Sequence, residues 1–235
     1  MQKITIIYNP RLISFMTLLL FLFATTVFAH GISESDKVFI EQISGMQLIS
    51  YIYLGAKHMV TGYDHLLFLT GVIFFLYRMR EIAAYVTLFA IGHSITLLFG
   101  VLSGTHVNPF IVDAIIGLSV VYKALDNMGG LKRILGFQPN TKAAVLIFGF
   151  FHGFGLATKL QEFTLSKDGL VPNILAFNVG VEIGQLLALA AILIAMSFWR
   201  RTETFKHQAF TANVALMTAG FVLMGYQITG CINTI

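Results

Sequence analysis

Long apolar segments, each close to the length of a transmembrane helix, follow one another from Asp64 almost to the C-terminus. No hydrophilic domain lies between them. Of the 235 residues, 57% are hydrophobic and 11% are charged, whereas soluble proteins average about 25% charged residues. A water-soluble fold of this length has too little interior to hide that much apolar surface. The chain is therefore predicted to be an all-α integral membrane protein.

Six transmembrane helices are predicted from the apolar segments and from the glycines, prolines and basic residues that separate them. The predicted spans are Tyr63–Tyr77, Ile82–Leu102, Pro109–Leu125, Thr141–Leu160, Val171–Trp199 and Ala209–Thr229.

The N-terminal residues 1–29 have the three parts of a secretory signal peptide: a basic start, the apolar stretch Ile13–Val27 and a small residue, Ala29, at the expected cleavage point. Cleavage would leave His30 as the N-terminus of the mature protein. The alternative is that this segment stays attached as an uncleaved first helix.

Residues 30–235 are predicted to form a single polytopic membrane domain, of which 30–62 is an external segment. Within this segment Met46–Val60 is apolar but too short to cross about 30 Å of hydrocarbon. It is predicted to be a short interfacial or half-inserted helix, which Gly62 separates from the first span. That span is itself short unless the preceding helix leads directly into it.

The basic residues between the spans predict the orientation of the chain, because cytoplasmic loops are enriched in lysine and arginine. With the mature N-terminus outside, the six spans also return the C-terminus to the outside. The inside loops then hold Arg78, Arg80, Lys123, Lys132, Arg133, Lys142, Arg200, Arg201 and Lys206, and the outside segments hold Lys37, Lys57, Lys159 and Lys167.

Several classes of function are excluded by what the sequence contains. The basic residues are dispersed in short loops, so they set topology and do not form a nucleic-acid-binding face. There is no Walker A loop and no dinucleotide fingerprint, so the chain is not expected to hydrolyse ATP or to use an organic cofactor. The single cysteine, Cys231, allows neither an internal disulfide nor a cysteine-rich metal site.

Ionisable side chains in or beside the predicted spans indicate a functional site. Each costs about 2.5–3.5 kcal/mol at the centre of a membrane helix and is usually kept for a pathway or a binding site. Those that could ligate a metal ion include His58, Asp64, His65, His93, Asp113, His152 and Glu182.

The spacing of these residues predicts which of them act together. His58 and His65 are two turns apart on one face if the helix is continuous, and Asp64 is beside His65. Asn178 and Glu182 are four residues apart, so both can face the same lumen. Imidazole and carboxylate groups together suit nickel, cobalt, zinc or manganese. Glycines near the buried histidines would let the helices approach closely.

Each residue also has a structural interpretation. His93 or His152 taken alone could be a hydrogen-bonding group between helices, and Asn178 could be a structural donor. Asp113 is near the start of its helix, where it could cap or hydrate the helix end. The group of His58, Asp64 and His65 is better explained by metal binding, because three potential ligands within eight residues are unusual in so apolar a chain.

These residues give the chain a resemblance to the HupE/UreJ family of bacterial nickel permeases, which extends over residues 30 to 235. His58, five residues and then Asp64-His65 resemble the family signature. Further blocks fit in the family's order: Leu66-Leu67-Phe68, Gly92-His93-Ser94 with Thr96-Leu97, Phe151-His152-Gly153, and Phe177-Asn178-Val179-Gly180-Val181-Glu182.

The resemblance implies an inner-membrane protein of roughly six helices that handles a divalent metal ion. A signal peptide and a histidine at the mature N-terminus, His30, also match the family. The family's functional residues carry over to His58, Asp64, His65, His152 and Glu182. The chain departs from the better-known nickel permeases after Phe151-His152-Gly153, where they have more histidines and an acidic residue. In this chain Glu182, on another helix, would have to supply the carboxylate, as in a divergent branch.

The leading prediction is a permease for a divalent transition metal, with nickel or cobalt favoured and zinc as a further candidate. His30 would capture the ion outside, and His58, Asp64 and His65 would bind it at the external mouth. A second site near the midplane would consist of His93, His152 and Glu182. Such ligands bind an ion well enough to accept it yet weakly enough to release it. The expected partners are the lipid bilayer, the ion and a metal-trapping or metalloenzyme-maturation protein.

Two other functions compete with transport. An intramembrane zinc hydrolase would use histidines and an aspartate to hold a zinc ion that activates water. A membrane metallochaperone, which inserts metal into another protein, would use the same ligands. One compact site with an open position favours hydrolysis, whereas two separated sites along a pore favour transport.

Overall fold

The structure, a computed structural model, describes residues 45–161 and 168–233. The predicted signal peptide, its cleavage site and His30 lie outside these residues. Within them all regular structure is α-helical, which confirms the all-α part of the predicted fold class. The helices are α3 (Leu48–Thr61), α4 (Tyr63–Ile73), α5 (Met79–Ser103), α6 (Pro109–Asn127), α7 (Gly130–Leu135), α8 (Thr141–Gln161), α9 (Leu170–Arg200) and α10 (Phe205–Asn233).

Four of the described helices, α5, α8, α9 and α10, are long and apolar enough to cross a membrane. They correspond to four of the six predicted spans. The helices at the other two predicted spans, α4 and α6, are not both long and apolar enough. Helix α4 has only 11 residues. Helix α6 has the expected length, but it includes Asp113, Lys123 and Asp126, which reduce its apolar character. Crossing by α4 and α6 therefore stays a prediction.

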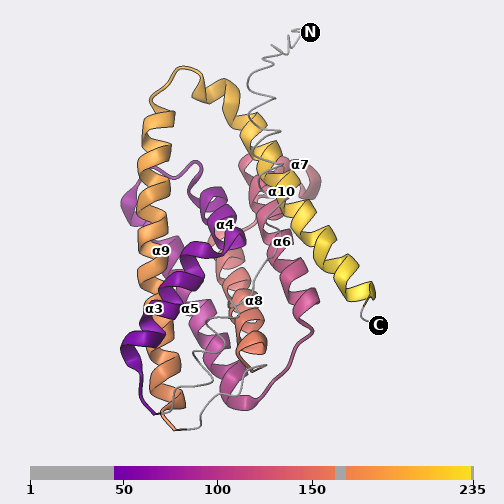
Figure 1. Ribbon diagram of the computed structural model, residues 1–235. Helices are drawn as coiled ribbons and strands as arrows, with labels where there is room; N and C mark the ends of the chain where they lie inside the picture. Colours follow the sequence, from indigo (N-terminus) through magenta and orange to yellow (C-terminus); the bar gives the residue numbers. More distant parts are fainter. Residues whose placement is uncertain (1–44, 162–167, 234–235) are drawn as a thin grey trace.

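The long helices pack as pairs in which glycines bring the backbones together. Helix α5 packs along α8, α3 along α9, and α6 along α10 (Figure 1). A Cβ atom on Gly92 of α5 would lie 2.6 Å from the carbonyl oxygen of Leu146 in α8. A Cβ atom on Gly117 of α6 would lie 2.7 Å from the backbone nitrogen of Met224 in α10. Small residues are how helices associate closely in lipid, where no hydrophobic effect drives them together.

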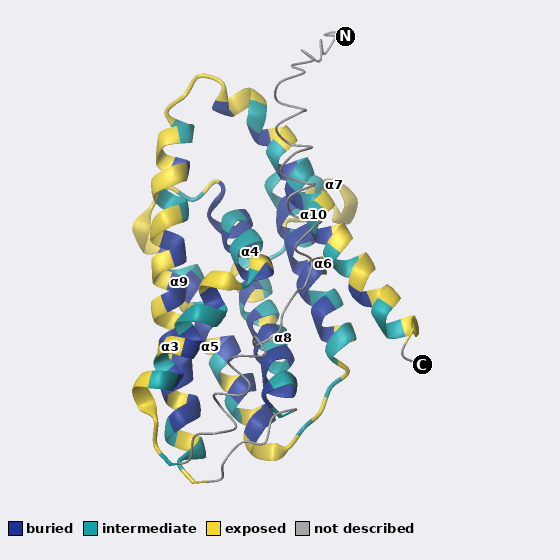
Figure 2. Cartoon of the chain, viewed as in Figure 1, coloured by how far each residue is buried: buried dark blue, intermediate teal, exposed yellow. Residues whose placement is uncertain are grey.

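Helix α4 lies among these pairs, in contact with α6, α9 and α10. Its buried residues include Phe68, Val72 and Ile73, which join an apolar cluster with Phe89 of α5. Figure 2 shows buried residues along the inner sides of the helices and exposed residues along the outer side of α9 and much of α10. The exposed residues of these helices include many large apolar side chains, as expected of surfaces in contact with lipid.

Helix α4 ends earlier than the predicted span Tyr63–Tyr77 because Arg200, at the end of α9, caps it. The Arg200 guanidinium donates hydrogen bonds to the carbonyl oxygens of Phe74 at 2.8 Å and Leu76 at 2.9 Å, and also to that of Ile73. The last carbonyls of a helix lack partners within it, and an arginine placed there satisfies them.

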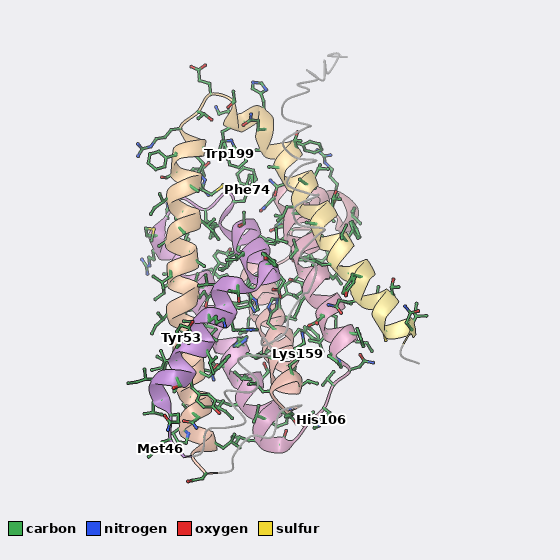
Figure 3. All side chains as sticks on the ribbon, in the orientation of Figure 1. Met46, Tyr53, Phe74, His106, Lys159 and Trp199 are labelled. Carbon is green, nitrogen blue, oxygen red and sulfur yellow. The ribbon has the colours of Figure 1, made fainter. Side chains whose placement is uncertain are left out.

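The connections of the bundle gather at two ends. The turn between α9 and α10 and the short helix α7 lie toward the upper end in Figure 1, and the start of α3 and the connection from α5 to α6 lie toward the lower end. Figure 3 marks the upper end by Phe74 and Trp199, whose rings are 5.8 Å apart, and the lower end by Met46 and His106. The loops that were predicted to face the cytoplasm thus include those of the upper end.

Candidate metal site

A break between α3 and α4 brings three of the predicted ligands together. The predicted two-turn spacing of His58 and His65 assumed a continuous helix, but Gly62 is extended at φ −73° and ψ 103°, and the helix ends and begins again there. The rings of His58 and His65 are nevertheless 5.2 Å apart. A Cβ atom on Gly62 would lie 2.5 Å from Nδ1 of His65. A side chain at position 62 would therefore displace His65.

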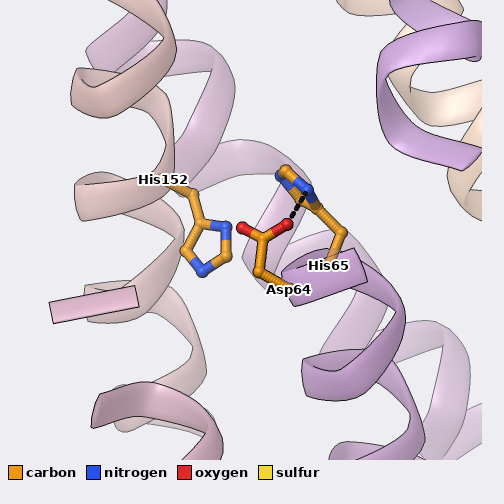
Figure 4. A group of neighbouring side chains, drawn as sticks. All are labelled: Asp64, His65 and His152. Carbon is orange, nitrogen blue, oxygen red and sulfur yellow. Dashed lines mark ion pairs between the residues drawn. The ribbon is translucent and has the colours of Figure 1, made fainter. Parts of the chain in front are cut away.

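Asp64, His65 and His152 form the one group among the described residues whose ligand atoms could share a metal ion. Their atoms lie within 4.8 Å of one another. Oδ1 of Asp64 is 3.1 Å from Nδ1 of His65, and the rings of His65 and His152 are 4.9 Å apart. Figure 4 shows His152, on α8, facing Asp64 and His65 across the space between the helices.

The three side chains lie in the interior of the bundle. Asp64 is 3% exposed, and His65 and His152 are each 2% exposed. His58 is partly buried at the edge of the group. A carboxylate is costly to hold in such a place unless a cation or hydrogen-bond donors compensate it. Two imidazoles and a carboxylate form a donor set that suits first-row divalent ions.

Aromatic rings surround this group. Phe89 of α5 is 4.9 Å from the ring of His152, and Phe68 of α4 is 5.7 Å from it. Phe177 of α9 is 6.1 Å from the ring of His58. These rings exclude water and lower the local dielectric constant, so the charge of a bound cation and the Asp64 carboxylate would interact more strongly than at the surface.

His93 lies beyond Phe89, outside the group of three. Its ring stacks on Phe89 at 6.2 Å, and the residue is 1% exposed. Asn178 of α9 lies beside the His93 ring. Among the described residues, neither side chain has a partner with good hydrogen-bond geometry. The structure therefore places His93 next to the group, with an aromatic ring between them.

The structure does not bring Glu182 to this group. Glu182 is exposed on α9, whereas Asn178, one turn earlier, is buried. The expectation that both face one lumen is therefore wrong. The physical reason is the orientation of α9, which turns Gly180 and Gly184 toward α3. This rotation places Glu182 at the edge of the buried face. A role for Glu182 or for His30 as a metal ligand stays a prediction.

Two further polar features were not among the predicted ligands. Nζ of Lys159 on α8 is 2.8 Å from Oδ2 of Asp113 on α6, so Asp113 pairs with a cation, and Asn108, not Asp113, caps the start of α6. Gln185 of α9 is 1% exposed and seven residues after Asn178. The signal that could have found Gln185 is this two-turn spacing of amides on a very apolar helix.

One of three comparisons with known proteins identifies a family for this chain. No curated protein and no solved structure matches the chain. One family model matches, that of the HupE / UreJ protein, over residues 34–234, which include the whole group. Membership of this family implies metal transport, and the chain belongs to the HupE/UreJ family.

Proposed function

We propose that this protein is a permease of the bacterial inner membrane that carries a divalent first-row transition metal, with nickel or cobalt as its cargo. The observation that carries the proposal is the buried group of Asp64, His65 and His152, with His58 beside it, in a chain of this family. The ion would bind between α4 and α8 as a transient substrate. The same donors also suit zinc.

The break at Gly62 supports a transport site. Transporters often bind ions where a membrane helix is discontinuous, because the C-terminal end of a half-helix directs its carbonyl groups at a cation. Helix α3 ends at Thr61, just before the two ligands at the start of α4. The partial negative charge at the end of α3 would thus add to the charge of Asp64.

We further propose that α3 and α4 together make one discontinuous span. Their 14 and 11 residues give 25 residues, or about 37 Å of helix at 1.5 Å per residue, enough to cross the hydrocarbon. Helix α6 would be a further span, because its charges are neutralised by ion pairs. Lys123 pairs with Asp126 at 2.6 Å, and Asp113 pairs with Lys159 at 2.8 Å. The result is six crossings, with both termini in the periplasm.

The driving force would be the membrane potential, which is worth about 2.3 kcal/mol per unit charge per 100 mV. A metal-binding protein inside the cell could add to it by trapping the ion. Transport would need no nucleotide, because the charge of the ion couples its movement to the membrane potential.

The test is uptake of Co²⁺ and Ni²⁺ by proteoliposomes that hold the purified protein and a metal-sensitive dye. His65→Ala and His152→Ala should each abolish uptake and the visible absorption of protein-bound Co²⁺. His207→Ala is the matched control, because His207 is exposed near the start of α10. Wild-type rates in both the His65 and His152 variants would refute the proposed site.

A second candidate is an intramembrane zinc hydrolase, which the compactness of the group favours. Three ligands that leave a coordination position open are typical of catalytic zinc sites. The same vesicles separate the two functions. A hydrolase or a metal-insertion factor would bind Co²⁺ through His65 and His152, but the metal inside the vesicles would stay at the level of protein-free liposomes.

A further inference from the structure

Two amide side chains on α9 lie buried in the bundle, and neither has a hydrogen-bond partner with good geometry in the described part of the chain. Asn178 is 6% exposed and Gln185 is 1% exposed. Among the residues that the structure describes, none donates to or accepts from the side-chain oxygen or nitrogen of either amide with good geometry. Both ring nitrogens of the neighbouring His93 likewise lack a hydrogen-bond partner with good geometry among these residues. Unsatisfied buried polar groups typically cost about 1–3 kcal/mol each, so this concentration requires an explanation.

A structural amide in a membrane bundle bonds across a helix interface, and the chain contains an example. Asn213 of α10 is 1% exposed. Its Oδ1 accepts a hydrogen bond from Asn127 at 2.9 Å, and its Nδ2 donates to the carbonyl oxygen of Ala209 at 2.9 Å. Among the described residues, Asn178 and Gln185 have no such pair of well-formed hydrogen bonds; Asn178 lies beside the ring of His93, and the polar atoms of both amides are available to a ligand.

The positions of the two amides connect them with the metal site. Asn178 lies beside His93, and His93 is separated from His152 by the ring of Phe89, which contacts both. Gln185 is two turns further along the same face of α9, in the direction of Arg200. The two amides therefore lie on one face of α9, with Asn178 beside His93 and Gln185 nearer the upper end of the bundle.

We propose that His93, Asn178 and Gln185 form a second cation site, which exchanges the divalent ion with Asp64, His65 and His152. This proposal rests on the proposed transport function. An imidazole nitrogen and amide carbonyl oxygens are neutral ligands, so they would hold the ion more weakly than a group that contains a carboxylate. A weaker site next to a stronger one lets the ion leave, which conduction requires.

The first test replaces the amides by an apolar side chain of similar size. Asn178→Leu and Gln185→Leu should lower Co²⁺ uptake by proteoliposomes at least about tenfold, as for loss of a metal-site contact. The absorption of Co²⁺ at the first site should stay unchanged in detergent. The melting temperature should stay the same or rise, because these variants remove unsatisfied polar groups.

Asn213→Leu is the matched control. It removes two hydrogen bonds and should lower the melting temperature, while uptake per folded protein is kept. If Asn178→Leu and Gln185→Leu transport at the wild-type rate, the second site is refuted. It is refuted equally if they behave like Asn213→Leu, with a lower melting temperature and unchanged uptake per folded protein.

A gain of binding provides an independent measurement. Gln185→Glu adds a carboxylate to the second site and should let the purified protein bind an additional equivalent of Co²⁺, with slower release into the vesicles. An unchanged stoichiometry would count against the second site. Failure of the transport function itself looks different: wild-type protein would then give no uptake above that of protein-free liposomes.

Discussion

Nδ1 of His65 lies 3.1 Å from Oδ1 of Asp64, so the carboxylate fixes the orientation of the imidazole that faces His152. A histidine that ligates a metal commonly directs its other ring nitrogen at a carboxylate, which sets the tautomer and makes the ring a better ligand. Asp64 can thus act on the ion directly or through His65.

Asp64→Asn is predicted to weaken Co²⁺ binding by about 10- to 100-fold, because the amide keeps the shape of the side chain but loses its charge. Titration of purified protein, followed by visible absorption, measures the change. Asp126→Asn is the control, since Asp126 belongs to an ion pair with Lys123 on α6, away from the metal group. Equal affinity of wild type and Asp64→Asn would exclude the carboxylate from the site.

The ion pair of Asp113 and Lys159 is predicted to stabilise the packing of α6 on α8. The two side chains are 7% and 13% exposed, and removal of one member of a buried pair leaves an uncompensated charge. Lys159→Met should therefore destabilise the protein by about 3 kcal/mol, measured as thermal unfolding in detergent.

The double variant Asp113→Asn with Lys159→Met separates structure from transport. It removes both charges and should recover most of the lost stability, because apolar or neutral replacements of a buried pair are often tolerated. Uptake of Co²⁺ should also recover. Recovered stability without uptake would show that the pair belongs to the ion path.

Arg200→Gln is predicted to loosen the end of α4. The guanidinium holds the carbonyls of Ile73, Phe74 and Leu76, and its loss should cost about 1–2 kcal/mol of stability. Hydrogen exchange should rise in residues 70–77, with little change in α5. Arg200→Lys keeps the charge but has fewer hydrogen-bond donors, so its hydrogen exchange in these residues should lie between that of wild type and that of Arg200→Gln. Unchanged exchange in Arg200→Gln would mean that α4 ends without this cap.

The long helices could be predicted from sequence because their apolar runs are continuous. The end of α4 could not, since it depends on Arg200, 127 residues away from Ile73. Likewise, the apolar pattern could not reveal that α6 neutralises Asp113 with Lys159 of α8. Contacts between distant segments leave no local pattern in the chain.

In the candidate site, too, the local features could be predicted from sequence and the contacts between distant segments could not. The nearness of His58, Asp64 and His65 was predictable, because they lie within eight residues of one another, and the break at Gly62 was predicted as well. His152 joins them only through the packing of the helices. Glu182 was misplaced because a four-residue spacing gives the angle between two side chains on a helix, but not which of them faces the core.

The orientation of the protein in the membrane provides the last prediction. Cys231, the only cysteine, lies near the end of α10, and its Sγ is 3.7 Å from Nδ2 of Asn108, just before α6. Six crossings with an external N-terminus place both residues in the periplasm. A membrane-impermeant maleimide should therefore label Cys231 in intact spheroplasts. The matched control is Thr202→Cys in a Cys231→Ser background, because Thr202 is exposed in the turn between α9 and α10. It should react only after lysis, and the reverse pattern would invert the proposed topology.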